Sequence, residues 1–205
     1  MEEKIATIKE WLGTGSINIF GLPMSGKDTV GVRLAEMLDA KFLSSGIIIR
    51  AIEEQEHLHY TEKGNLWPTD MFRERILPYI GREDLANSPL ILSSVGRWSG
   101  EEVPVMEACE KYGHPIKAVI SLNVSESDVM NRWRAAKELG DRGDRLDDKK
   151  EEVMQQRILE FRSKTLPVLQ YYQNLGLLLS VNADASRDEV FNNVIEVLYG
   201  RSQEG

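Results

Sequence analysis

The stretch that decides the fold is INIFGLPMSGKDTVGVRLAEML, residues 17–38. Its apolar run ends at Gly21, the pair Gly26-Lys27 follows five residues later, and the apolar residues then take the spacing of a helix. A glycine-rich turn between a buried strand and a helix points backbone N–H groups inward, and the helix N-terminus adds positive potential. The stretch therefore predicts a phosphate-binding loop, in which Lys27 reaches the outer phosphates of a nucleotide.

Asp28 does not fit this interpretation at first sight. Most phosphate-binding loops of this kind place Ser or Thr directly after the lysine, and this chain has a carboxylate there. A carboxylate at that position should repel a phosphate. The competing interpretation is a glycine-rich turn between strand and helix with an incidental lysine.

The composition sets limits on partners and compartment. The chain has 205 residues, a formal charge of −8 and one cysteine. A nucleic-acid binder needs a basic face, so no nucleic-acid partner is expected, and no apolar run is long enough to predict a membrane span. Cys109 cannot form an intramolecular disulfide and is expected on the apolar face of a helix. We expect a cytoplasmic monomer without a signal peptide.

Short apolar runs alternate with helical patterns along the whole chain. This alternation predicts one domain with a parallel sheet covered on both faces, whose ligands bind beyond the carboxyl ends of the strands. Residues 1–14 add an amphipathic helix, because Ile5, Ile8, Trp11 and Leu12 share one face. The three histidines lack metal-ligand spacing and are expected at the surface. Strands are predicted at 16–20, 41–43, 89–92, 117–123 and 177–181, and helices at 27–39, 46–56, 69–80, 101–112, 126–139, 148–162, 165–174 and 186–199.

The segment GLPMSGKDT, residues 21–29, resembles the Gly-x-Pro-Gly-x-Gly-Lys-Gly-Thr loop of adenylate kinases and related nucleoside monophosphate kinases. That family has Gly after the lysine and Thr next, and Thr29 matches it. The resemblance extends from about residue 16 to residue 199. The other matching segments are FLSSGIIIRAI (42–52), KGNLWP (63–68), LILSSVGRWSGEE (90–102), DRLDD (144–148) and QRILEF with KTLPVLQYY (156–172).

The resemblance implies a P-loop fold of three α/β/α layers with about five parallel strands. It also implies a nucleoside monophosphate-binding lobe at 45–75 and a short lid at 134–146 without a zinc knuckle. The implied reaction is transfer of the γ-phosphoryl group of ATP, bound with Mg²⁺, to a nucleoside monophosphate. The implied catalytic residues are Lys27, Arg97, Arg145 and Arg157; the ATP-binding residues are Gly21, Pro23, Met24, Ser25, Gly26, Lys27, Asp28, Thr29, Arg132 and Arg142; the acceptor-binding residues are Ser45, Gly46, Arg50, Leu66, Arg97 and Glu101.

Several residues depart from the family pattern. Met24 replaces a loop glycine, so its side chain fits if the backbone keeps a negative φ. Ser93 replaces the aspartate that orders the magnesium water shell in the family. Ala136 stands where many relatives carry a lid arginine, for which Arg134 or Lys137 is a substitute. Two further departures are Ile47 in place of an aspartate and Val95-Gly96 in place of Phe-Pro.

Three interpretations of Asp28 follow. Asp28 holds magnesium in place of an acid at position 93, since hard divalent ions prefer carboxylate oxygens. Alternatively, Asp28 weakens ATP binding and the chain binds nucleotides without catalysis. In the third interpretation, Asp28 points away from the phosphates and caps the helix that it begins.

The acceptor base is predicted from Glu101, which replaces a glutamine. An ionised carboxylate accepts hydrogen bonds but donates none. It suits the exocyclic amine of adenine or cytosine, which favours AMP or CMP over UMP. Of the two, we expect AMP. The alternatives to this function are a nucleotide-binding pseudokinase and a P-loop kinase for another small acceptor.

Overall fold

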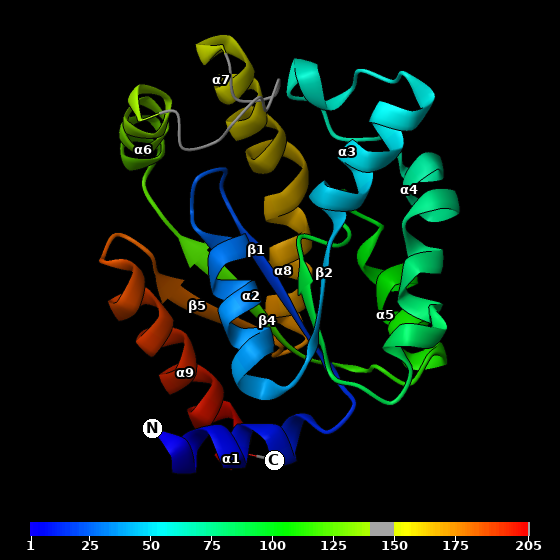
Figure 1. Ribbon diagram of the computed structural model, residues 1–205, viewed down its shortest axis with the longest axis vertical. Helices are drawn as coiled ribbons and strands as arrows, with labels where there is room; N and C mark the ends of the chain where they lie inside the picture. The colour runs from blue at the N-terminus through cyan, green and yellow to red at the C-terminus, as the bar shows by residue number, and fades with distance from the viewer. Residues whose placement is uncertain (140–149, 205) are drawn as a thin grey trace.

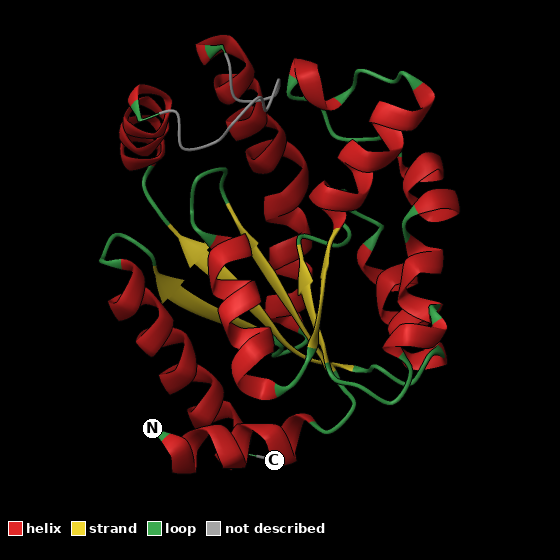
Figure 2. Ribbon diagram, viewed as in Figure 1, coloured by secondary structure: helices red, strands yellow, loops and turns green. Residues whose placement is uncertain are grey.

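The computed structural model describes residues 1–139 and 150–204, and its centre is a sheet of five parallel strands in the order β2-β3-β1-β4-β5 (Figures 1 and 2). The predicted parallel α/β fold is therefore confirmed, and each predicted strand is present within two residues of its expected ends. The strands are β1 (Ser16–Gly21), β2 (Lys41–Ser44), β3 (Leu90–Ser93), β4 (Ile116–Asn123) and β5 (Leu178–Asn182).

Helices connect the strands and cover both faces of the sheet (Figure 2). Among the described residues, no helix is long and apolar enough to cross a membrane. The helices are α1 (Glu2–Leu12), α2 (Lys27–Leu38), α3 (Ser45–Glu56), α4 (Thr69–Arg75), α5 (Glu102–Lys111), α6 (Glu126–Glu138), α7 (Glu151–Glu160), α8 (Leu166–Asn174) and α9 (Arg187–Gln203).

The central strand β1 is buried along its whole length, between β3 and β4. Because successive side chains of a strand point to opposite faces, Ile17 and Ile19 pack with α1, α2 and α9, whereas Phe20 packs with Tyr172 of α8 on the other face. The register pairs Ile19 with Ser93 and Gly21 with Leu122. The carboxyl ends of β1, β3 and β4 thus lie side by side where the glycine-rich loop begins.

The N-terminal helix α1 packs its predicted apolar face against the core. Ile8 and Leu12 are buried there, and α1 lies across the end of α9 (Figure 1). We expect Ile8→Ala to lower the free energy of unfolding by about 2–5 kcal/mol, because the lost methyl groups leave a cavity. Urea denaturation measures this change, with the exposed Glu10→Ala as the control on the same helix. An equal effect of both substitutions would show that α1 is not part of the core.

Two predicted helix boundaries and one predicted environment are wrong. The helix predicted at 69–80 ends as an α-helix at Arg75 and continues as a 3₁₀ turn from Leu77 to Gly81, because Pro78 lacks an N–H and disfavours α geometry at Leu77. The gap predicted between 162 and 165 is instead a π-helical turn, Phe161–Thr165, that joins α7 to α8. His114 is buried rather than exposed, and its Nδ1 lies 3.1 Å from the carbonyl oxygen of Thr14.

Cys109 lies where the sequence predicts. It is fully buried on α5, and burial raises the pKa of its thiol to about 12. The thiol is therefore protonated at neutral pH and acts as a small core residue.

Candidate active site

The glycine-rich loop leaves β1 at Gly21 and enters α2 at Lys27. Gly26 has φ +86° and Met24 has φ +64°, so the condition given for Met24, a negative φ, is not met. The left-handed region costs a non-glycine residue about 1–2 kcal/mol, which the remaining contacts of the loop must offset. A Cβ on Gly21 would lie 2.5 Å from Ser25 Oγ, and that buried hydroxyl has no hydrogen-bond partner among the described residues. The loop thus makes a tight turn that encloses the Ser25 hydroxyl.

A cleft opens in front of this loop and encloses about 700 Å³, a volume that includes space open to solvent. Four cationic side chains line it, each from a different element: Lys27 begins α2, Arg50 lies on α3, Arg97 follows β3 and Arg157 lies on α7. Segments far apart in the sequence therefore bring positive charge to one place, although the whole chain is acidic. The cleft also contains the predicted residues Gly21, Pro23, Gly46 and Leu66.

Arg97 lies at the centre of this positive cluster. It is half-buried, its Nε donates to the carbonyl of Ser94 at 3.3 Å, and its backbone carbonyl accepts from the Thr165 hydroxyl at 3.1 Å. Burial, and next the charge of Arg157, lower its pKa to about 10, while Asp28 opposes the shift. Arg97 remains protonated at neutral pH, and a bound anion would relieve the repulsion between the guanidinium groups.

A smaller pocket of about 250 Å³ adjoins the cleft and ends at Glu101. Glu101 is 1 % exposed; its Oε2 accepts from the backbone amides of Arg97 at 2.8 Å and Trp98 at 3.0 Å. Its Oε1 has no hydrogen-bond partner among the described residues, nor does Trp98 Nε1. The pocket thus offers one buried acceptor and one buried donor. Its lining includes Ser45, Ile49, Leu66, Trp67, Phe72, Ser94 and Arg97.

Burial raises the pKa of Glu101. The backbone hydrogen bonds from Trp98 and Arg97, the Thr69 side chain and the charge of Arg97 only partly offset this shift. A carboxyl with a raised pKa in the folded state stabilises the fold below its ordinary pKa and loses that contribution as pH rises through the raised pKa. We expect wild type to gain stability relative to Glu101→Gln as pH falls. Urea denaturation from about pH 8 to about pH 4 measures the difference, with the exposed Glu107→Gln as control. Parallel stability curves for wild type and Glu101→Gln would contradict this prediction.

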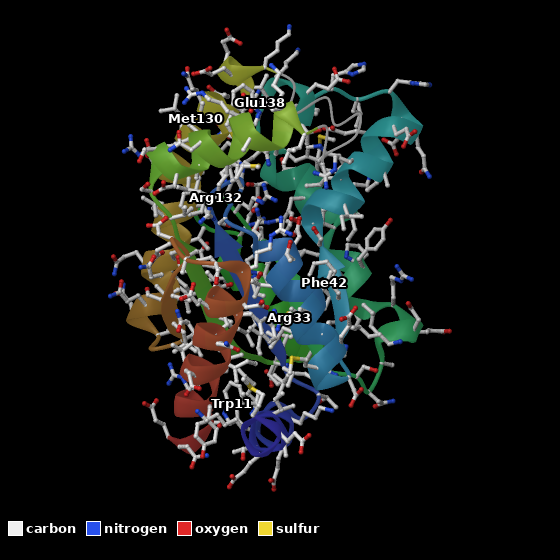
Figure 3. All side chains as sticks on the ribbon, turned by 60° about the vertical axis from the view of Figure 1, so that its left-hand side comes forward. Trp11, Arg33, Phe42, Met130, Arg132 and Glu138 are labelled. Atoms are coloured by element: carbon white, nitrogen blue, oxygen red, sulfur yellow. The ribbon has the colours of Figure 1, made fainter. Side chains whose placement is uncertain are left out.

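A broader cavity of about 1440 Å³ lies on the other side of the glycine-rich loop, between α2, α6 and α9. Arg132 spans it: one nitrogen donates to the carbonyl of Met24 at 3.3 Å and the other to that of Ala183 at 2.6 Å. Arg132 and Arg33, which lies over the Phe191 ring, face the same side of the molecule (Figure 3). The cavity contains the predicted residues Met24, Ser25, Gly26, Thr29 and Arg132.

Neither proposed substitute for a lid arginine lines this cavity. Ala136 lines it, whereas Arg134 is exposed and pairs with Glu151 at 3.3 Å, and Lys137 lies over the Trp133 ring. Arg142, Arg145 and residues 140–146 of the predicted lid lie outside the described residues.

Asp28 lies beside Ser93, which resembles an aspartate position of the family. The Ser93 hydroxyl donates to Asp28 Oδ1 at 2.5 Å. Helix α2 has Gly26 as its N-cap, so Asp28 lies in the first turn of the helix, with its Oδ1 at Ser93 of β3. The carboxylate that the sequence lacks at 93 is therefore supplied next to it from α2.

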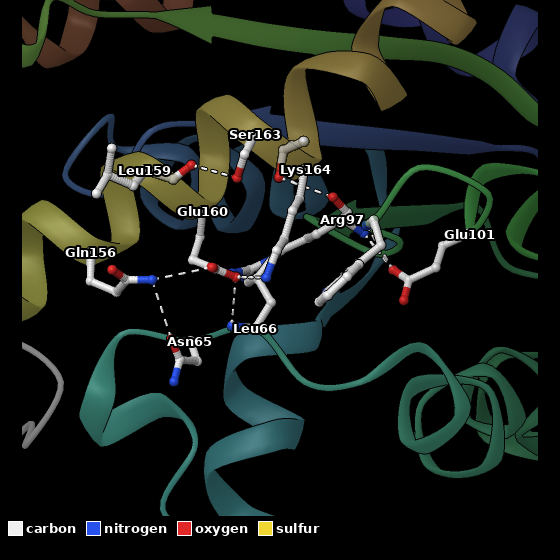
Figure 4. Close-up of polar contacts among 11 residues, drawn as sticks. Asn65, Leu66, Arg97, Glu101, Gln156, Leu159, Glu160, Ser163 and Lys164 are labelled. Carbon is white, nitrogen blue, oxygen red and sulfur yellow. Dashed lines mark hydrogen bonds and ion pairs between the residues drawn. The ribbon is translucent and has the colours of Figure 1, made fainter.

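Several residues of the cleft were not predicted from the sequence. Glu160 is 7 % exposed and joins α7 to the segment opposite: it accepts from the Leu66 amide at 3.2 Å, from Gln156 at 3.2 Å and from Lys164 at 2.5 Å (Figure 4). Lys164 lies 3.8 Å from the centre of the Trp98 ring. A carboxylate three residues after Arg157 looks like an ordinary helix-surface residue, so the sequence held no signal for it. Thr61, Asn65, Trp67, Phe161 and Thr165 also line the cleft.

The strand order and the glycine-rich loop before α2 define a P-loop NTPase-like protein. A family model described as an AAA domain matches residues 20–163. The chain is 33% identical over 186 residues to the adenylate kinase of Mycobacterium tuberculosis, covering 88% of this chain and 97% of that protein. The chain belongs to the adenylate kinase family, as its motifs predict. It is also 32% identical to adenylate kinase 1 of Nostoc sp. (83% and 91% covered) and 26% identical to the adenylate kinase of Bacillus velezensis (90% and 98% covered).

Proposed function

We propose that this protein transfers the γ-phosphoryl group of ATP to a nucleoside monophosphate, and that AMP is the acceptor it prefers. The observation that carries the proposal is the convergence of Lys27, Arg50, Arg97 and Arg157 on one cleft beside the glycine-rich loop. Phosphoryl transfer needs positioning and positive charge around the transferring group and little covalent chemistry. Such a cluster is what an adenylate kinase-like phosphotransferase requires.

The two cavities suggest how the substrates are arranged. ATP would place its phosphates on the loop, with the buried hydroxyl of Ser25 and Lys27 as ligands, and its base in the cavity that Arg132 spans. The acceptor phosphate would meet Arg50 and Arg97 in the cleft. Arg145, Arg142 and the lid would close over the donor and exclude water, as the family resemblance implies.

Glu101 supports AMP as the acceptor. The exocyclic amine of adenine donates to an acceptor such as the unpartnered Oε1 of Glu101. A uracil carbonyl at that point would face a carboxylate oxygen, and two acceptors repel each other. Cytosine also carries an exocyclic amine and is the second choice.

Magnesium fits the donor side of the cleft. The carboxylate of Asp28 and the hydroxyl of Ser93 are hard oxygen ligands, and Mg²⁺ is commonly bound by one or two carboxylates together with substrate phosphates. No group of three or more His, Cys, Asp or Glu in the described parts of the chain would form a site by protein alone. Bound Mg²⁺ would supply charge neutralisation between the donor phosphates, and Asp28 would orient it.

The experiment that tests the function measures ADP formation from ATP and Mg²⁺ with AMP, CMP, UMP, GMP or dAMP offered separately. Turnover with AMP above the others, absent in Lys27→Ala, is the expected result. Transfer to no nucleotide while ATP still binds would favour a pseudokinase or a different small acceptor. Transfer chiefly to CMP would keep the reaction and change the acceptor.

A further inference from the structure

Residues 61 and 64–67 line the cleft, and the buried carboxylate of Glu53 contacts this segment at several points. Glu53 of α3 is 5 % exposed, and its Oε1 accepts from the backbone amides of Tyr60 and Thr61, both at 3.1 Å. Its Oε2 accepts from the hydroxyl of Thr61. Burying a carboxylate costs free energy, and hydrogen bonds to both oxygens offset that cost.

The same carboxylate fixes an aromatic side chain of the acceptor pocket. The indole Nε1 of Trp67 donates to Glu53 Oε1 at 2.8 Å, and Trp67 is 3 % exposed. Trp67 lines both the cleft and the smaller pocket that ends at Glu101. Because its N–H is bound to Glu53, the indole ring of Trp67 is fixed in position where it lines these cavities.

A second buried carboxylate holds the segment from the other side. Glu160 Oε2 accepts from the Leu66 amide at 3.2 Å, so Leu66 is tied to the last residue of α7 (Figure 4). Glu53 therefore holds residues 60, 61 and 67 of this segment to α3, whereas Glu160 holds Leu66 to α7. The two carboxylates contact different atoms and have separable effects.

We propose that Glu53 is a positioning residue for the acceptor, which acts by holding Trp67 and the 60–67 segment in the conformation that forms the acceptor pocket. This inference rests on the proposed function and adds to it a residue that no motif of the chain indicates. Glu53 does not line the acceptor pocket itself; it acts through Trp67 and through the backbone of Tyr60 and Thr61. Its hydrogen-bond partners Tyr60, Thr61 and Trp67 do not line the cavity that Arg132 spans.

Glu53→Gln tests the proposal with almost no change in volume. The glutamine amide nitrogen cannot accept, so the Thr61 hydroxyl loses its acceptor at Oε2. The N–H donors of Tyr60, Thr61 and Trp67 keep an oxygen acceptor but lose the negative charge that strengthens their hydrogen bonds. We expect the KM for the acceptor to rise about tenfold, with the KM for ATP within about twofold of wild type. Glu54→Gln, an exposed neighbour on the same helix, is the matched control.

Trp67→Phe identifies the route of the effect. It removes the indole N–H while keeping an aromatic side chain, so the combined Glu53→Gln/Trp67→Phe variant should raise the acceptor KM less than the product of the two single effects. Effects that multiply independently would show that Glu53 does not act through Trp67. A rise of both KM values together in Glu53→Gln would indicate general loss of structure and overturn the proposal.

Hydrogen exchange separates this proposal from the proposed function, because it needs no turnover. The amides of Tyr60 and Thr61 should exchange about tenfold faster in Glu53→Gln than in wild type or Glu54→Gln. Unchanged exchange with an unchanged acceptor KM overturns the role of Glu53. If wild type transfers phosphate to no nucleotide, the proposed function fails. AMP binding measured by calorimetry then replaces the KM for the acceptor. Weaker AMP binding in Glu53→Gln but not in Glu54→Gln supports the role of Glu53, and equal binding in wild type and Glu53→Gln overturns it.

Discussion

Lys27→Ala is expected to lower kcat for phosphoryl transfer about 100- to 1000-fold. Lys27 is the first residue of α2 and lines the cleft with Arg50, Arg97 and Arg157. A cation fixed where charge develops in the transition state commonly contributes two to three orders of magnitude. The arginines cannot replace it, because each comes from a different element and is held at its own position.

The measurement is the steady-state rate of ADP formation at saturating ATP and acceptor, with the melting temperature measured in parallel. Lys41→Ala is the matched control, because Lys41 is an exposed lysine at the opposite end of a neighbouring strand. We expect Lys41→Ala to retain the wild-type rate. A Lys27→Ala variant that folds and keeps its kcat would mean that the glycine-rich loop does not bind the transferring phosphate.

The fold was predictable because its signals are local and repeated. The apolar runs that become β1 to β5, and the helical spacing between them, leave a parallel sheet as the simplest arrangement. The errors lie where a local preference competes with tertiary structure. Pro78 ended the α-helical geometry after α4, whereas Pro167 lies in the first turn of α8, where its missing N–H costs little.

The site was predictable to the extent that it follows motifs. The loop, Arg50, Arg97 and Arg157 could be placed by resemblance, and the structure brings them to one cleft. Glu53 and Glu160 could not, because a glutamate in a helix is ordinarily a solvated surface residue. Their burial depends on segment 60–67, whose path no sequence pattern fixes. The positive φ of Met24 could not be predicted either, because methionine rarely adopts it and only the conformation of the loop requires it.

The pair Asp28 and Ser93 offers the sharpest test of the proposal that Asp28 orients magnesium. The family resemblance expects Gly at 28 and Asp at 93, and this chain has the carboxylate and the small residue exchanged. The hydrogen bond of 2.5 Å between the two side chains shows that they share one location at the end of β3. One carboxylate at this location is thus retained and delivered from α2 instead of β3.

Asp28→Gly is expected to lower kcat about 100-fold and to raise the Mg²⁺ concentration needed for half-maximal rate, since the local carboxylate is lost. Adding Ser93→Asp should restore the rate to within about tenfold of wild type, because the carboxylate returns from the neighbouring strand. Ser93→Asp alone should also be impaired, because two carboxylates at hydrogen-bond distance repel each other. Calorimetry of ATP binding with and without Mg²⁺ gives a readout independent of turnover. An unchanged Mg²⁺ dependence in Asp28→Gly, or no recovery in the double variant, would show that Asp28 has not taken over this role and that the substitution instead weakens donor binding.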